Sequence, residues 1–274
     1  MLNKPLDKVV FLDIETVPEK ESFFDLSIRK QQLFAEKFKK DVAELGLGDN
    51  SRLGVEVGKS VDLSAEADNR AKMELLYANK APLFPEFGKI ICISIGFIKP
   101  NQVPSMIEDL PVTKALDFQT VSFYGHDEKE LLKKFHESTA KMIDARINIQ
   151  YSMCSHNGFN FDWPYIGKKF VMHSLPIPAF FDYGEKKPWD VTWFIDTKNI
   201  WKWGVYDGNV SLDLLCEVFD VPTSKDDIKG SQVRDVYYKD KNLERIKVYC
   251  EKDCIVLAQI YLKMKGLPNK LING

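Results

Sequence analysis

Two acidic residues, Asp13 and Glu15, stand one residue apart in an apolar run over residues 9–16. Because side chains alternate between the two faces of a β-strand, both carboxylates point to the same face. Like charges held together near a core repel each other and lose hydration. Mg²⁺ or Mn²⁺, which prefer oxygen ligands, would relieve both effects. The spacing therefore indicates a metal-binding pair, and the alternative is a pair that faces solvent at a sheet edge.

A third acid, Asp253, lies in the middle of a helix predicted over residues 243–265. It shares one face of that helix with apolar residues at helical spacing, namely Ile246, Cys250, Leu257, Ile260 and Met264. An unpaired charge on a buried face is unfavourable, so Asp253 needs either a metal or a basic partner such as Arg234 or Arg245. Tyr249 precedes Asp253 by four residues and projects on nearly the same face, where a core aromatic role is the alternative.

The fourth acid, Asp162, follows a predicted strand over residues 147–154 and a glycine-containing turn. Loops at strand ends commonly place functional groups, and Asp162 also suits a helix N-cap. His156, in the same turn, is expected to hydrogen-bond to the backbone rather than to bind a metal. Four carboxylates and a phenol suit two-metal phosphodiester hydrolysis, in which two cations hold the scissile phosphate and activate a water molecule.

The remaining pattern predicts an α/β fold with a mixed central sheet and flanking helices. Strands are predicted over residues 8–16, 88–98, 118–124, 147–154 and 193–196, and helices over 127–141, from about 162, over 212–219 with Ser211 as N-cap, and over 243–265. Residues 19–82 lack strand signals and contain helical runs around 28–45 and 65–79. We therefore expect one domain over residues 1–274 with a helical insertion at 19–82, after the first strand.

The composition is that of an ordinary globular protein, with 274 residues and a formal net charge of −2. Because the chain has no overall basic field, any contact with nucleic acid must be local. No apolar stretch has the length of a membrane span, and the N-terminus has no secretory core, so we expect a cytoplasmic protein without membrane contacts. The five cysteines are expected to be buried and reduced. Cys250 and Cys254 could share a metal, but no second Cys/His pair accompanies them.

Three short motifs carry a family resemblance: Asp-Ile-Glu-Thr at 13–16, Asn-Gly-Phe-Asn-Phe-Asp at 157–162, and Tyr-Cys-Glu-Lys-Asp at 249–253. In this order they resemble the three exonuclease motifs of the DEDD 3′–5′ exonucleases. The tyrosine at 249 is typical of the tyrosine-bearing branch. The second motif, with Trp-Pro-Tyr at 163–165, most resembles the proofreading domain of family B DNA polymerases and the stand-alone predicted exonucleases related to it.

The resemblance implies a ribonuclease H-like fold and a site for two ions, Mg²⁺ or Mn²⁺. It implies that Asp13 bridges both ions, that Glu15 and Asp253 complete one site, and that Asp162 serves the other. It further implies that Tyr249 positions the attacking water. The expected reaction is stepwise release of nucleoside 5′-monophosphates from a 3′ end.

The expected substrate is a single-stranded or frayed 3′ end, of DNA rather than RNA. The resemblance places Thr16 beside the terminal nucleotide and suggests Asn157 and Phe161 as further substrate-binding residues. A 3′–5′ exoribonuclease and a non-catalytic nucleic-acid-binding module are the alternatives, although the presence of all four acids argues against the latter. The sequence does not identify a polymerase or repair partner.

A tryptophan- and lysine-rich segment offers a second candidate for nucleic-acid contact. Its aromatic residues are Trp189, Trp193, Trp201 and Trp203, and its lysines are Lys186, Lys187, Lys198 and Lys202. Alternating aromatic and basic side chains are typical of surfaces that stack the bases of single strands. The alternative is a set of core aromatics beside solvated lysines, and we favour it for at least two of the four tryptophans. Residues 222–232, with alternating charges, predict a surface loop that could bring Lys225 or Lys229 near a substrate phosphate.

Overall fold

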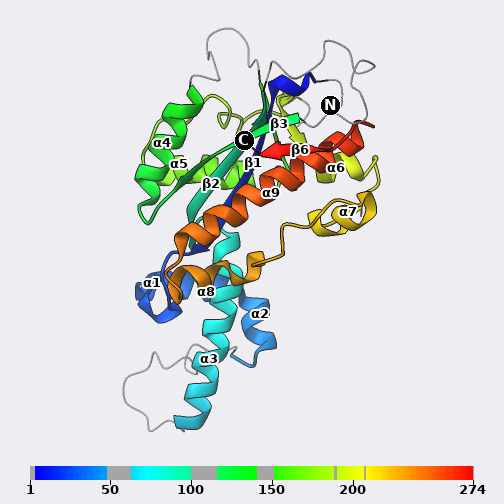
Figure 1. The fold of residues 1–274 in the computed structure, drawn as a ribbon. Coiled ribbons are helices and arrows are strands. Elements are labelled where there is room, and N and C mark those ends of the chain that lie inside the picture. The colour runs from blue at the N-terminus through cyan, green and yellow to red at the C-terminus, as the bar shows by residue number, and fades with distance from the viewer. Residues whose placement is uncertain are drawn as a thin grey trace. The chain divides into compact units, whose positions relative to one another are not determined.

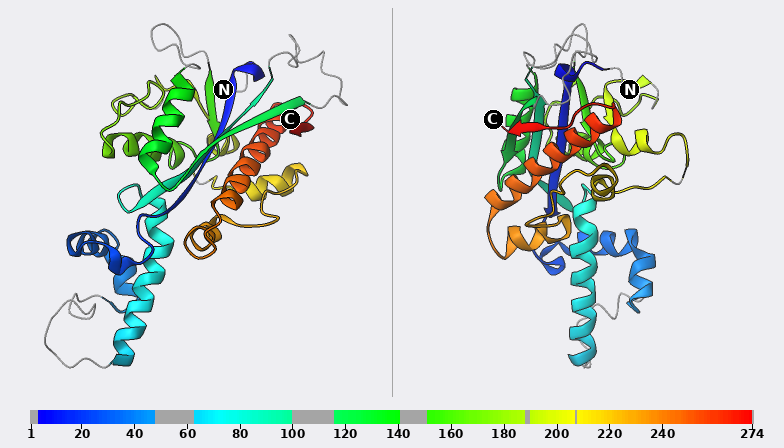
Figure 2. Two further views of the ribbon diagram at one scale, coloured as in Figure 1. Left: turned by 60° about the vertical axis from the view of Figure 1, so that its left-hand side comes forward. Right: turned by 45° about the vertical axis from the view of Figure 1, so that its right-hand side comes forward.

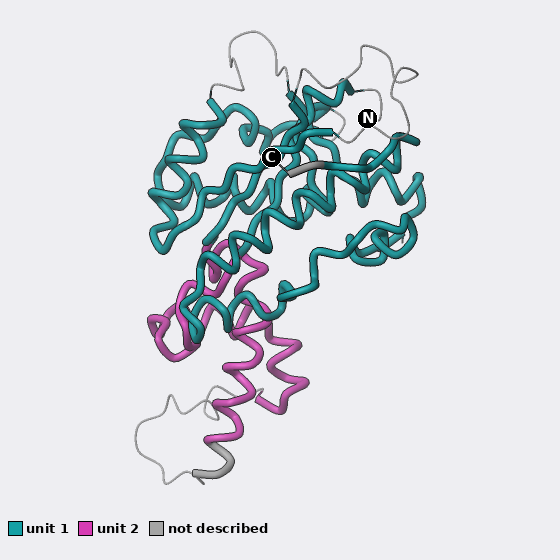
Figure 3. The backbone as a smooth tube through the Cα atoms, in the orientation of Figure 1, with its two compact units in different colours: residues 1–15, 90–274 teal, residues 16–89 magenta. Residues whose placement is uncertain are grey.

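The computed structural model describes residues 4–47, 63–99, 116–140, 151–187, 190–206 and 208–273. The chain divides into two compact units, which Figure 3 shows in different colours. The first unit consists of residues 1–15 and 90–274, and the second of residues 16–89. The second unit therefore interrupts the first unit in sequence, directly after the two N-terminal acids.

A mixed β-sheet organises the first unit (Figure 1). Its strands, in the order β5-β4-β1-β2-β3-β6, are β1 (Val9–Pro18), β2 (Gly88–Ile98), β3 (Leu116–Tyr124), β4 (Ser152–Ser155), β5 (Phe194–Asp196) and β6 (Leu271–Asn273). β4 pairs in parallel with both β1 and β5, β3 pairs antiparallel with β2, and β6 pairs in parallel with β3. The mixture of directions confirms the predicted α/β sheet.

Helices cover both faces of this sheet (Figure 2). α4 (Glu128–Ala140) and α5 (Asp162–Met172) share one apolar core with the sheet, and the long helix α9 (Leu243–Met264) shares another. The shorter helices are α6 (Thr197–Trp201), α7 (Leu212–Phe219) and α8 (Val233–Tyr238), with 3₁₀ turns at Leu6–Lys8 and Gly230–Gln232. α7 packs on α9 through a small core that includes Leu215, Val256 and Ile260.

The two faces of β1 are buried against different helices. Val10, Leu12 and Ile14 belong to the core that contains the apolar side chains of α4 and α5. Phe11 belongs instead to the core formed with α9, where its ring lies 5.8 Å from that of Tyr261. Because side chains alternate, Asp13 and Glu15 lie on the face of β1 that α9 covers. The alternation predicted from the sequence is therefore observed.

The second unit is helical and has its own aromatic core. Its helices are α1 (Ile28–Lys37), α2 (Lys39–Glu44) and α3 (Leu63–Lys80), with 3₁₀ turns at Phe23–Asp25 and Ala81–Leu83. The core includes Phe23, Phe34, Phe38 and Tyr77. Glu74 of α3 accepts hydrogen bonds from the Ser22 hydroxyl and from the backbone N–H of Phe23. The helical runs predicted around 28–45 and 65–79 are confirmed, and most of the break between them lies outside the described residues.

Several short elements differ from the sequence prediction. α6, α8 and β6 were not predicted because each spans six residues or fewer, too few to show a periodic pattern. The described part of the predicted strand 147–154 becomes β4, which begins at Ser152. Ser211 caps α7 as predicted, since its hydroxyl accepts a hydrogen bond from Leu214 N–H at 3.1 Å. Among the residues that the structure describes, no helix is long and apolar enough to span a membrane.

The close approach of β2 and β3 at Gly96 gives a test of this sheet. A Cβ atom at Gly96 would lie 2.2 Å from Cζ of the fully buried Phe118. We expect Gly96→Ala to lower the free energy of unfolding by about 1–3 kcal/mol through overpacking. Urea denaturation followed by tryptophan fluorescence measures this loss. Gly125→Ala is the matched control, because its nearest neighbouring atom would lie 4.0 Å away. Equal midpoints for the two variants would contradict the strand pairing.

Candidate metal centre

Three of the predicted acids meet where β1 faces α9. Asp13, Glu15 and Asp253 each offer a carboxylate oxygen, and these oxygens lie within 4.8 Å of one another. The two residues of β1 share a strand face, and Asp253 lies on the buried stripe of α9. Carboxylate oxygens at this separation are suitable ligands for a hard divalent cation. Tertiary packing therefore joins side chains that are separated by more than 230 positions in the sequence.

Asp162 lies close enough to this group to affect its ionisation. It is the first residue of α5, and the N-cap position is occupied by Phe161, so the predicted N-cap role of Asp162 is wrong. Its carboxylate instead accepts hydrogen bonds from its own N–H and from that of Ile14 in β1. Its charge raises the pKa of both Asp13 and Glu15. The structure thus brings all four predicted carboxylates close enough to influence one another's pKa values.

The pKa values show that the negative charge of this centre is not balanced by the protein. Burial is the largest cause that raises the pKa of Asp13 and Glu15, and repulsion from Asp253 is the second. Burial also raises the pKa of Asp253, and it raises that of Asp162 to about 8. Bound divalent cations favour the ionised form of each carboxylate and would reverse these shifts. The all-oxygen ligand set therefore fits Mg²⁺ or Mn²⁺.

Tyr249 lies beside the same carboxylates. Its hydroxyl hydrogen-bonds to Asp253, and burial is the largest cause that raises its pKa above the ordinary value. The neighbouring charges of Asp253, Glu15 and Asp13 raise that pKa further. The phenol therefore stays protonated and acts as a hydrogen-bond donor, not as a base.

Asp253 receives a neutral partner that the sequence did not predict. The hydroxyl of Ser224 donates a hydrogen bond to its Oδ1, and Ser224 is buried. The two arginines considered from the sequence form ion pairs elsewhere, Arg245 with Asp227 at 2.7 Å and Arg234 with Asp235 at 3.0 Å. The basic-partner alternative for Asp253 therefore fails for both arginines.

The segment 222–232, predicted as a surface loop, forms ion pairs with α9. Lys252 of α9 forms an ion pair with Asp226 at 2.7 Å, and Arg245 of α9 binds both oxygens of Asp227. Lys225 lies 3.1 Å from Asp213, and its charge lowers the pKa of Asp253. These contacts hold the segment against α9 and α7. No pattern in the segment itself indicated them, since each involves a residue of another element.

Two protonated thiols of α9 lie beside the centre. Cys250 Sγ lies 3.4 Å from Asp13 Oδ2 and donates a hydrogen bond to it. Cys254 donates to the carbonyl of Ser94 at 3.3 Å. Burial raises the pKa of both thiols, which keeps them neutral. All five cysteines are free and buried, as predicted, and Cys250 and Cys254 donate to different acceptors, which gives no support to a shared zinc ion.

Asp196, which was not singled out in the sequence, orders the turn that precedes Asp162. Its carboxylate accepts hydrogen bonds from the N–H groups of Asn157 and Phe159 at 2.9 and 3.2 Å. It also caps α6 by accepting from Lys198 N–H at 2.9 Å. Asn157 adopts a left-handed backbone conformation with φ 68°. The sequence feature that could have identified Asp196 is its position at the end of a predicted strand, where an aspartate commonly caps the helix that follows.

The remaining residues of the second motif form local contacts. His156 Nε2 donates to the carbonyl of Val210 at 3.0 Å, which confirms the expected backbone hydrogen bond. The side-chain oxygen of Asn157 accepts from Asn160 at 2.9 Å, and the Phe161 ring packs edge-on against Tyr165. The Asn157 and Phe161 contacts order the turn and do not by themselves define a substrate site.

Thr16 is the first residue of the second unit, and its hydroxyl donates to the carbonyl of Pro82 at 2.8 Å. The proposed role of Thr16 beside a terminal nucleotide therefore rests on its place in the sequence, directly after Glu15.

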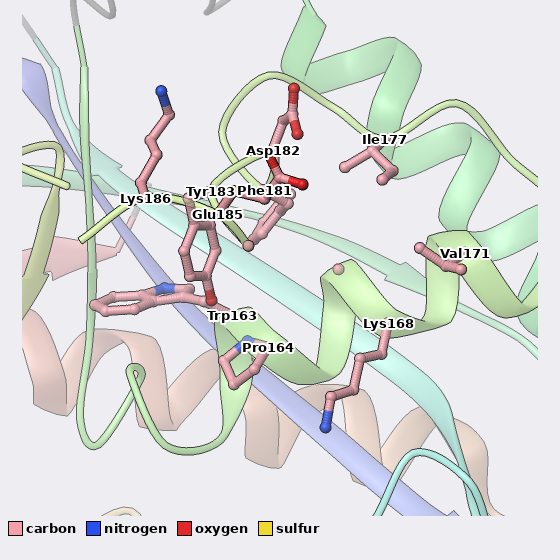
Figure 4. Close-up of a pocket in the computed structure, with 12 residues that line it drawn as sticks. Trp163, Pro164, Lys168, Val171, Ile177, Phe181, Asp182, Tyr183, Glu185 and Lys186 are labelled. Atoms are coloured by element: carbon pink, nitrogen blue, oxygen red, sulfur yellow. The ribbon is translucent and has the colours of Figure 1, made fainter. Parts of the chain in front are cut away.

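A cavity of about 520 Å³ lies along α5 and the segment that follows it (Figure 4). Trp163, Lys168, Phe181 and Tyr183 are among its lining residues. None of the four acids lines it. The candidate metal centre is therefore distinct from this cavity, although Asp162 and Trp163 are adjacent in the chain.

Comparison with known families gives the class of the protein. Residues 87–273, more than half of the chain, match the family described as "Predicted 3'-5' exonuclease related to the exonuclease domain of PolB". The chain belongs to this family, and its mixed sheet with flanking helices is the ribonuclease H-like exonuclease fold. No curated protein matches the chain. The matched range includes Asp162, Tyr249 and Asp253 but not Asp13 or Glu15, which the structure places against Asp253.

The raised pKa values predict how stability depends on pH when EDTA removes divalent cations. The folded protein keeps protons on these carboxyls at pH values where the unfolded chain has released them, near pKa 3.8 for aspartate. The contribution of these carboxyls to the free energy of unfolding should therefore be greatest below about pH 4. It should fall as the pH rises toward about 8. Each unit of raised pKa corresponds to about 1.4 kcal/mol. Urea denaturation at a series of pH values measures the slope.

Two comparisons separate this effect from general titration. Asp162→Asn should flatten the profile in EDTA, whereas Asp182→Asn, at an exposed acid outside the centre, should leave it unchanged. Saturating Mg²⁺ should also reduce the slope, because it binds the ionised carboxylates. A profile in EDTA that is flat for the unmodified protein would contradict the shifts.

Proposed function

We propose that the protein is a metal-dependent 3′–5′ exonuclease that acts on single-stranded or frayed DNA ends and releases nucleoside 5′-monophosphates. The observation that carries this proposal is the meeting of Asp13, Glu15 and Asp253 within 4.8 Å, with Asp162 nearby. Membership of the exonuclease family supports it. We further propose that residues 19–82 form an insertion within a single exonuclease domain.

The proposed roles come from the family resemblance, and the proximity of the acids supports them. Asp13 would hold both of two cations, Glu15 and Asp253 would complete one site, and Asp162 would serve the other. Two such cations, when bound, stabilise negative charge on the attacking and leaving oxygens of a phosphodiester. The chain holds the carboxylates in place before metal binds, because Cys250, Ser224 and the N–H of Ile14 hydrogen-bond to them.

Tyr249 would orient the attacking water. Its raised pKa keeps the hydroxyl protonated, and its hydrogen bond to Asp253 fixes the position of the phenol. A water molecule bound to this oxygen would be held beside the carboxylates that bind metal. Thr16, Asn157 and Phe161 remain the proposed contacts to the terminal nucleotide.

The metal centre is tested by Asp13→Asn, which preserves the shape of the side chain and removes its charge. We expect hydrolysis of a 5′-labelled DNA oligonucleotide in Mg²⁺ or Mn²⁺ to fall by about 10³-fold or more. EDTA should abolish hydrolysis by the unmodified protein. Asp117→Asn, at a surface acid paired with Lys99, is the matched control and should keep its activity. Full activity of Asp13→Asn would refute the assignment.

The role of Tyr249 is tested by Tyr249→Phe, which removes only the hydroxyl. We expect kcat to fall by about 10- to 100-fold, with a smaller effect on the Mg²⁺ concentration at half-maximal rate. Tyr261→Phe, on the same helix in the apolar core, is the matched control. An unchanged kcat for Tyr249→Phe would show that the ring serves only packing.

A further inference from the structure

The chain presents an unusually exposed aromatic segment directly after α6. Trp203 is 83% exposed and Tyr206 is 95% exposed, with Trp201 and Val205 also exposed. A contiguous apolar surface of this kind commonly marks a binding site. The expectation that at least two of the four tryptophans lie in the core stays a prediction, because one of the four lies outside the described residues. Trp193 packs against the core, whereas Trp201 and Trp203 do not, and Trp189 lies outside the described residues.

A cavity of about 360 Å³ adjoins these aromatic residues. It is lined by Ile200, Trp201, Trp203, Phe219, Lys263 and Met264. The rings of Trp201 and Phe219 meet edge to face at 5.4 Å, which fixes one wall. The volume is within the range of small-ligand pockets, and Lys263 is the charged residue among the lining side chains. Aromatic walls beside a cation are suited to a nucleobase and its phosphate.

The charges near this surface favour nucleic acid over an apolar protein partner. Lys202 stands between Trp201 and Trp203 in the chain, and Lys198 lies one helical turn before it. Lys263, which belongs to α9, also lines the cavity. Surfaces that bind single strands combine stacking aromatics with lysines that track the phosphates. A partner that covered only the apolar rings would gain nothing from these cations.

Two elements connect this surface to the metal centre. Asp196 caps α6, which leads into the aromatic segment, and also holds the turn before Asp162. Helix α9 carries both Asp253 and Met264. These residues are eleven positions apart, which is about three helical turns, so they share a face at a separation of about 16 Å. At about 3.4 Å per stacked nucleotide, this distance corresponds to about five nucleotides.

We propose that Trp201, Trp203 and Tyr206, with Lys202 and Lys263, form a stacking platform for the single strand whose 3′ end occupies the metal centre. The platform binds bases about five nucleotides from that end. It reads no base sequence, because every base offers a π-face. This inference rests on the proposed exonuclease function for the direction of the strand, and the binding surface itself can be tested without catalysis.

Binding is measured by fluorescence anisotropy of 5′-labelled dT12 and rU12 in EDTA, where hydrolysis does not occur. We expect Trp203→Ala and Tyr206→Ala each to raise Kd by about 10-fold, and Trp203→Phe to restore most of the affinity. Both oligonucleotides should respond, because stacking does not use the 2′-hydroxyl; a response by only one would contradict a platform that binds by stacking. Tyr124→Ala, at an exposed tyrosine of β3, is the control. Unaltered Kd values for both oligonucleotides would overturn the proposal.

Catalysis gives a second and independent measurement. The loss of kcat/KM in Trp203→Ala should depend on length, with about 10-fold for dT12 and less than 2-fold for dT3, which is too short to reach the platform. An equal loss for both lengths would overturn the platform as a separate site. If no oligonucleotide is hydrolysed but Trp203 still contributes to binding, the platform stands and the proposed exonuclease function fails.

Discussion

The main constraint on this structure is the repulsion among buried carboxylates where β1 meets α9. Asp13 and Glu15 on the strand and Asp253 on the helix bring their charges together in surroundings that raise the pKa of each. Such a cluster would be excluded from an ordinary core, because each charge loses hydration and gains a like-charged neighbour. The presence of this cluster in a buried place therefore favours a cationic ligand, and its oxygen donors are suited to a hard divalent ion.

The protein supports these acids with neutral hydrogen-bond donors. The thiol of Cys250 donates a hydrogen bond to Asp13. The hydroxyl of Ser224 and the phenol of Tyr249 both donate to Asp253. Each donor fixes the direction of a carboxylate and leaves most of its charge available. A lysine or arginine in the same place would compete with the metal. Nearby basic residues are instead paired with other acids, as Lys225 is with Asp213 and Lys252 is with Asp226.

Helix α9 links the chemistry to the proposed recognition of the strand. Its central part carries Asp253 of the candidate metal centre, and its C-terminal end lines the aromatic cavity through Lys263 and Met264. Under the proposed function, this arrangement would explain how a chain with a net charge of −2 acts on a polyanion, because the favourable contacts would be local ones at the metal centre and a few lysines. Rigid spacing along one helix would then set the length of strand that is bound.

The sequence by itself determined the local geometry of the site. Strict alternation in β1 put Asp13 and Glu15 on one face, and helical spacing put Tyr249 and Asp253 on another, because these periods are properties of the backbone. It could not determine the hydrogen bonds from Ser224 to Asp253 or from the Asn157 N–H to Asp196, or the exposure of Trp203. Those features arise only when distant surfaces pack, and local spacing does not specify which surface a given face will meet.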